Sequence, residues 1–178
     1  MVELSVIRDL VAIAEVFIGL TYYILNIRNQ RENRQAQLFM QLYQTKSDQQ
    51  GLENWFNLLN MEWKDFDDFN HKYSRQSNPD IYALIESQIS FYEGLGVLMQ
   101  EKKIDPDMVY KLVGRRILIL WAKMGDMIKG WRLMDHGPGP DYAEPFEYLV
   151  GEMIKIRKLK GLPLYEGRLN PSEMPHTS

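Results

Sequence analysis

The residues of this chain that could carry acid–base, metal or nucleophilic chemistry are scattered along it. The three histidines, His71, His136 and His176, stand far apart in sequence, in predicted turns or in the tail. No Ser/His/Asp, His-x-x-x-His, Walker or Rossmann pattern brings a nucleophile, a metal ligand or a phosphate cradle together. The absence of cysteine excludes disulfides, thiolate catalysis and thiolate-bound zinc. We therefore expect no catalytic residues, no metal site, no cofactor and no enzymatic activity.

Two groups of carboxylates could act as metal ligands. Glu86 and Glu93 are seven residues apart on one face of a predicted helix, but the Glu-x-x-His pairs of a di-iron bundle are missing. The aspartates of the run WKDFDDF at residues 63–69 alternate with aromatic residues that need burial. A solvated acidic turn with an aromatic underside is the favoured interpretation of that run, and a metal site is the alternative.

A Gly-x-Gly pair, Gly94 and Gly96, could cradle a phosphate if a strand preceded it. The sequence before it predicts a helix, so we expect these glycines to allow close contact between helices. One enzymatic or ligand-binding alternative remains, in which a pocket between helices is lined by Tyr92, Glu93, Trp121 and Trp131. A buried Glu93 that faces a cavity would favour this alternative. Glu93 bonded to a neighbouring helix or turn would favour a structural role.

The elements that must position these residues are helical. Proline after a capping Asn or Asp, at Asn78-Pro79 and Asp105-Pro106, predicts helix starts. Apolar residues recur at helical spacing. They predict helices over residues 52–63, 79–102, 106–134 and 145–159, with a break at residues 46–51. The run ILILW at residues 117–121 is apolar on every side and should be the most buried turn.

An apolar stretch at residues 10–27 precedes this domain. Eighteen helical residues span roughly 27 Å, close to the hydrocarbon thickness of a bilayer. Glu15, Gly19, Thr21 and Asn26 interrupt the apolar character, which makes the predicted span marginal by itself. A soluble helix packed on the domain and a cleaved secretory signal are the alternatives, although the signal lacks a basic start and a small-x-small cleavage site.

Small or polar residues in this stretch recur with alternating spacings of four and three. Five of them form what we call the seam: Ala12, Glu15, Gly19, Tyr22 and Asn26. Such spacing places them on one stripe of a helix, where small residues allow close approach and a carboxyl in lipid needs a partner. The seam therefore predicts self-association within the membrane. In a further alternative, the chain is a soluble oligomer and residues 10–27 form its dimerisation helix.

Charge gives the predicted orientation. Arg28, Arg31 and Arg34 follow the apolar stretch, whereas Glu3 and Asp9 offset Arg8 before it. The positive-inside rule then places the N-terminus outside and the main domain in the cytoplasm, at the cell membrane. The net charge of −3 and the lack of a basic patch with interleaved aromatics argue against nucleic-acid binding.

Taken in chain order, the features resemble a known family. They are the apolar N-terminal helix, ENRQAQLFMQLYQ at residues 32–44, WKDFDDF at 63–69, Asn78-Pro79, FYEGLGVL at 91–98 and Ile104-Asp105. This order is similar to the functionally uncharacterised membrane-anchored proteins of the DUF4760 type, seen in archaea and bacteria, and the likeness covers roughly residues 5–160. The resemblance implies one N-terminal membrane helix and an all-helical cytoplasmic domain, and it brings no activity or catalytic residue with it.

The prediction is an all-α protein. It consists of a short segment (1–9), a transmembrane helix (10–27), a helical cytoplasmic domain (28–162) that opens with a juxtamembrane helix (28–45), and a flexible tail (163–178). The favoured function is a non-enzymatic interaction or regulatory module tethered to the bilayer, with an unknown protein partner.

Overall fold

The computed structural model describes the backbone of residues 2–163 and, within that range, the side chains of all residues except 2–7, 31, 32 and 45. Its six helices are α1 (Val2–Ser47), α2 (Gln49–Asn60), α3 (Phe66–Tyr73), α4 (Pro79–Gln100), α5 (Pro106–Arg132) and α6 (Glu144–Leu159). No strand occurs in this range, so the all-α prediction is confirmed. The predicted flexible tail lies almost entirely outside the described residues.

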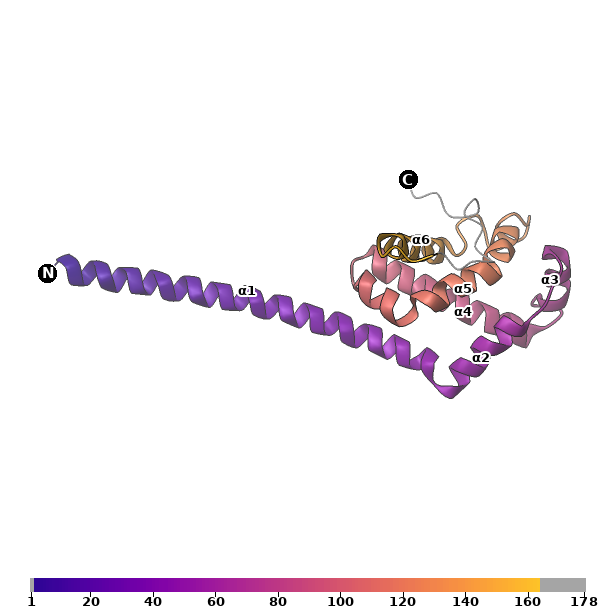
Figure 1. The fold of residues 1–178 in the computed structure, drawn as a ribbon, viewed down its shortest axis with the longest axis horizontal. Helices are drawn as coiled ribbons and strands as arrows, with labels where there is room; N and C mark the ends of the chain where they lie inside the picture. The colour runs from indigo at the N-terminus through magenta and orange to yellow at the C-terminus, as the bar shows by residue number, and fades with distance from the viewer. Residues whose placement is uncertain (1, 164–178) are drawn as a thin grey trace. The chain divides into compact units, whose positions relative to one another are not determined.

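The chain divides into two compact units, Met1–Gln44 and Thr45–Ser178. The first consists of most of α1, which Figure 1 shows as one uninterrupted helix. Its 46 residues correspond to about 69 Å of helix at a rise of about 1.5 Å per residue. The predicted apolar helix and juxtamembrane helix are therefore continuous, as the sequence indicated.

Local capping explains where α1 ends and α2 begins. The Asp48 side chain accepts a hydrogen bond of 2.7 Å from the Gly51 N–H, which makes Asp48 the N-cap of α2. Gly51 thus lies in the first turn of α2 rather than in the predicted break. A Cβ there would lie 2.7 Å from the Lys46 carbonyl oxygen, so only glycine fits this sharp turn.

The acidic run after Trp63 corrects one prediction. It forms the short helix α3 instead of a solvated turn, because Asp65 caps it by accepting a hydrogen bond from the Asp68 N–H at 2.9 Å. Phe69 is fully buried, so the aromatic underside is confirmed. The predicted caps Asn78 and Asp105 do begin α4 and α5.

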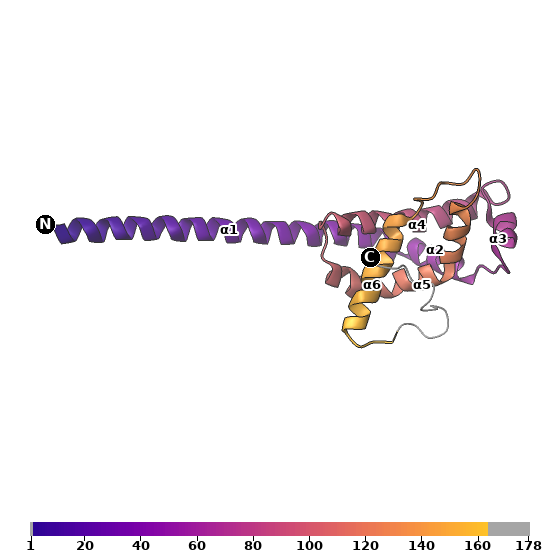
Figure 2. The ribbon, with the colours of Figure 1, turned by 90° about the horizontal axis from the view of Figure 1, so that it is seen from above.

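The second unit is built on α4, α5 and α6. Figure 2 shows α4 and α5 running in opposite directions and α6 lying across them. The side chains of ILILW are buried except for the half-buried Ile119, and Phe146 of α6 is fully buried. Gly96 lets α4 and α6 approach closely, because a Cβ there would overlap the Pro145 carbonyl oxygen. This confirms the helix-contact role that the sequence predicted for Gly96. The same prediction is wrong for Gly94, which is exposed and has no atom within 4 Å of a Cβ placed on it.

Candidate functional site

Two of the four predicted pocket residues meet around one ring. Tyr92 of α4 stacks on Phe146, with ring centroids 5.4 Å apart and planes at 21°. Trp121 of α5 meets the same ring edge-on at 5.3 Å. Tyr92 and Trp121 are 3% and 5% exposed, respectively. These two side chains are therefore joined by the Phe146 ring as parts of the core.

Trp131, the third aromatic residue of the predicted pocket, belongs to a different cluster. Its ring makes edge contacts with Phe69 of α3 at 5.4 Å and with Tyr82 of α4 at 6.1 Å. Tyr142, in the connection between α5 and α6, lies 5.9 Å away on a near-perpendicular plane. Trp131 therefore ties the far end of α5 to three other segments.

Glu93 bonds to a neighbouring turn, which is the geometry that favours a structural role. Its Oε1 accepts a hydrogen bond from the Ala143 N–H at 2.9 Å. Ala143 is the N-cap residue of α6, has a left-handed backbone (φ 59°) and has no capping side chain of its own. Glu93 thus accepts the N–H of the N-cap residue, the role that a Glu or Gln three residues into the helix plays in a capping box. Burial raises the pKa of Glu93, and the bond from Ala143 opposes this rise.

The second carboxylate of α4 also points to this connection. Glu86 Oε1 accepts a hydrogen bond of 2.8 Å from the Tyr142 hydroxyl. Burial first, and the bond to Glu86 second, raise the pKa of Tyr142 far above its usual range. Arg132 completes the arrangement by donating to the Tyr142 carbonyl oxygen at 2.8 Å and pairing with Glu147 at 2.7 Å. The shared face of Glu86 and Glu93 therefore fastens the Pro/Gly-rich connection to α4.

The remaining candidates for chemistry show no grouping. No group of three His, Cys, Asp or Glu side chains suited to a metal ion occurs among the described residues. His71 and His136 are exposed, and His176 lies outside the described range. Asp68 accepts hydrogen bonds from the Lys72 ammonium and from the Lys64 N–H, and these bonds, the first above all, lower the pKa of its carboxyl. The aspartates at positions 65 and 68 thus serve the ends and surface of α3.

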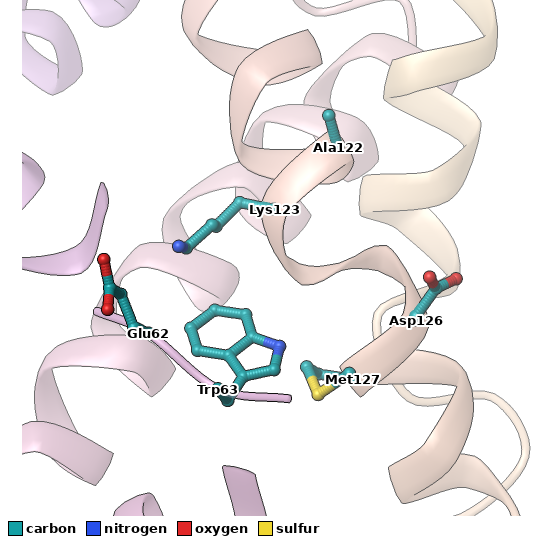
Figure 3. A pocket seen from close by; sticks show the side chains of 6 residues that line it. All are labelled: Glu62, Trp63, Ala122, Lys123, Asp126 and Met127. Carbon is teal, nitrogen blue, oxygen red and sulfur yellow. The ribbon is translucent and has the colours of Figure 1, made fainter. Parts of the chain in front are cut away.

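A surface pocket of about 400 Å³ lies between the α2–α3 connection and α5. Figure 3 shows its lining: Glu62, Trp63, Ala122, Lys123, Asp126 and Met127. The Lys123 ammonium lies 4.3 Å from the centroid of the Trp63 ring and donates a hydrogen bond to the Met61 carbonyl oxygen. That carbonyl follows the end of α2, where helix carbonyls lack partners. Lys123 therefore fixes the end of α2 to α5. The polar group that lines this pocket thus has a structural role.

The seam residues of α1 are exposed, as are their neighbours along the helix. All the described side chains from Arg8 to Gln30 are exposed, including Ala12, Glu15, Gly19, Tyr22 and Asn26. A Cβ at Gly19 would have no atom within 4 Å. The window of highest hydropathy in Arg8–Gln44 averages 1.9, so this helix is long and apolar enough to cross a membrane by length and composition.

Comparison with known proteins places the chain in a family. A family model described as a domain of unknown function, DUF4760, matches residues 9–153. The chain belongs to the DUF4760 family. Neither the curated proteins nor the solved structures gave a match. The resemblance read from the sequence is thus confirmed at the level of the family, and the family description names no activity.

Sequence reasoning missed two polar contacts of this DUF4760 chain. Tyr142 and Glu86 are 56 residues apart, and Lys123 and Met61 are 62 apart, so no local pattern joins them. One signal was available for Tyr142. A tyrosine between a Pro/Gly-rich turn and a helix start often needs a partner for its hydroxyl when its ring is buried.

Proposed function

We propose that this DUF4760 protein is a single-pass membrane protein whose helical unit, Thr45–Ser178, is a non-enzymatic interaction or regulatory module. One observation carries the anchor: twelve large apolar side chains between Leu10 and Ile27 are exposed, from 44% for Ile27 to 71% for Tyr22. Burial of one such side chain is worth about 1.5–3 kcal/mol, so a covering environment is strongly favoured. A bilayer supplies it along the stretch from Leu10 to Ile27, roughly 27 Å of helix.

The polar groups of α1 are compatible with this environment. The Thr21 hydroxyl donates to the Phe17 carbonyl oxygen at 2.8 Å, which satisfies its hydrogen within the helix. The Asn26 side chain accepts from Gln30 at 3.5 Å. The arginines after the apolar stretch support an N-terminus outside the cell membrane and a helical unit in the cytoplasm.

The seam supports self-association of this anchor. Glu15 lies within the apolar stretch, where a carboxyl is costly unless it is neutral and bonded to another polar group. In a parallel pair of α1 helices, the two Glu15 side chains would face each other as polar partners, and Gly19 one turn later would allow close approach. Glu15→Leu and Gly19→Leu should each reduce crosslinked dimers in membranes, with Ile18→Leu, outside the seam, as the control. Unchanged dimers in both variants would remove the seam from the proposal.

The non-enzymatic assignment rests on what the polar side chains do. Glu93, Glu86 and Arg132 hold a connection in place, and Lys123 holds a helix end. A hydrolase or transferase activity of the purified protein that is lost in Asp67→Asn would overturn this assignment. Asp67 is exposed on α3, and its substitution should leave the fold intact.

Membrane fractionation tests the anchor. The full chain and a version lacking residues 1–27 are expressed, and the membranes are washed with alkaline carbonate. The full chain should stay in the pellet after the wash, and the shortened chain should be found in the supernatant before it. Release of the full chain by carbonate would overturn the anchor, and a soluble oligomer from the same wash would favour α1 as a dimerisation helix.

A further inference from the structure

We propose that one end of the helical unit binds the anionic phospholipid headgroups of the membrane to which α1 is anchored. This basic end consists of the start of α5 with the turn before it and the last turns of α6. Its cations are Lys103, Lys111, Lys155, Arg157, Lys158 and Lys160, and its apolar residues are Leu159 and Leu162. The inference rests on the proposed anchor.

Direct contacts bring these segments together. The Lys160 ammonium pairs with Asp107 at 3.1 Å and lies 4.6 Å from the centroid of the Tyr110 ring. A Cβ at Gly114 of α5 would lie 3.3 Å from the Met153 sulfur of α6. Figure 2 shows the end of α6 (yellow) reaching past α5. The cations of residues 103–111 and 152–160 therefore share one end of the unit.

The charge of this end is opposite to that of the remainder. Residues 103–111 and 152–160 contain six cations and three carboxylates, a formal charge of +3. Since the chain carries −3 in total, all other residues together carry −6. An anionic surface would therefore attract this end and repel much of the rest, which gives the unit a preferred orientation.

Two exposed leucines indicate that the partner of this basic end is a lipid surface. Leu159 is 87% exposed between Lys158 and Lys160, and Leu162 is 43% exposed. The helix dipole stabilises cations at a helix C-terminus, which could by itself account for the lysines of α6. It does not account for an exposed leucine among them. Leucines that project between lysines match the boundary between headgroups and acyl chains. Since the anchor keeps the unit beside the bilayer, even weak contacts would be populated.

The absence of cysteine makes a clean test possible. Leu159→Cys in the full chain is labelled with an environment-sensitive dye. The protein is reconstituted into vesicles of phosphatidylcholine alone or of phosphatidylcholine mixed with the anionic lipid phosphatidylglycerol. Emission should shift to the blue in the anionic vesicles and return at high salt. A dye at His136→Cys is the control, because it lies beyond the other end of α5, whose 27 residues correspond to about 40 Å. Its emission should not change.

A triple variant, Lys155→Gln, Lys158→Gln and Lys160→Gln, tests the role of charge. Each lysine near an anionic surface raises the ratio of docked to undocked protein about fivefold. Loss of three lysines should therefore lower this ratio on the order of a hundredfold. A dye at Leu162→Cys repeats the measurement with Leu159 in place, and circular dichroism checks the fold. Identical spectra of both dyes in the two kinds of vesicle would overturn the inference. Carbonate extraction of the same vesicles separates the two failures: retained protein without a spectral shift rejects only the basic end, and released protein rejects the anchor.

Discussion

The Gly-x-Gly pair of α4 offers two substitutions of the same chemistry with opposite expected results. Gly96 is buried against α6, and Gly94, two residues earlier, is exposed. A Cβ at Gly96 would overlap the Pro145 carbonyl oxygen and lie 2.5 Å from its carbonyl carbon, whereas a Cβ at Gly94 would have no atom within 4 Å. Gly96→Ala and Gly94→Ala therefore separate helix propensity from helix packing.

The magnitudes follow from these two environments. Replacing glycine by alanine within a helix stabilises it by about 0.5–1 kcal/mol, and Gly94→Ala should gain this amount. At Gly96 the obstructing atoms belong to the backbone, which cannot rotate away, so α4 and α6 must separate. Overpacking of this kind costs about 1–3 kcal/mol, which exceeds the propensity gain. The propensity gain applies to both variants and cancels, so their free energies of unfolding should differ by the overpacking cost, about 1–3 kcal/mol.

Urea unfolding of the full chain in detergent micelles, followed by tryptophan fluorescence, measures this difference. Trp121 and Trp131 lie in the core of the same helical unit and report its unfolding. The midpoint should rise for Gly94→Ala and fall for Gly96→Ala, at an unchanged slope. A Gly96→Ala protein as stable as the wild type would refute the close α4–α6 contact, and equal losses in both variants would point to a role for the glycines other than helix packing.

Three further predictions concern the polar contacts. Glu93→Ala should destabilise the helical unit by about 1–3 kcal/mol, because it leaves the Ala143 N–H without its acceptor, and chemical denaturation would show no loss if that bond were unimportant. Burial raises the pKa of Glu93 in the folded protein, so the ionised carboxylate lowers the stability of the fold. This loss of stability is present above the raised pKa and disappears as the pH falls through it. The wild type should therefore gain stability relative to Glu93→Gln on acidification, and a difference that is independent of pH would contradict this. Lys123→Met should alter Trp63 fluorescence and cost about 1 kcal/mol by freeing the Met61 carbonyl, whereas Lys64→Met, a matched exposed lysine, should do neither.

Local signals allowed much of the fold to be predicted. Asn78-Pro79 and Asp105-Pro106 mark the starts of α4 and α5 because capping depends on residues only a few positions apart. The same capping rule could have predicted α3, because the Asp65 side chain accepts a hydrogen bond from the Asp68 N–H three residues later. The alternation of aspartate with aromatic residues concealed this, since eight residues are too few to show helical periodicity.

The site could be predicted only in part, because its contacts join distant segments. The shared face of Glu86 and Glu93 was evident from their spacing of seven. Their partners, Tyr142 and Ala143, lie 56 and 50 residues away in sequence. Ala143 begins α6 with a left-handed backbone and without a side-chain cap, and no sequence pattern signals a positive φ at alanine. The choice between a pocket and a structural role for Glu93 therefore required the structure.

The anchoring of α1 is the central claim, and the depth of spin labels on this helix tests it most directly. Leu10, Ile18 and Ile27 are exposed, and the chain has no cysteine, so a single cysteine at each position can carry the label. In lipid vesicles, the label at position 18 should be the most accessible to oxygen and the least accessible to a water-soluble nickel complex. Labels at positions 10 and 27 should lie nearer the two surfaces. Equal access of the nickel complex to all three positions would contradict a membrane-spanning helix.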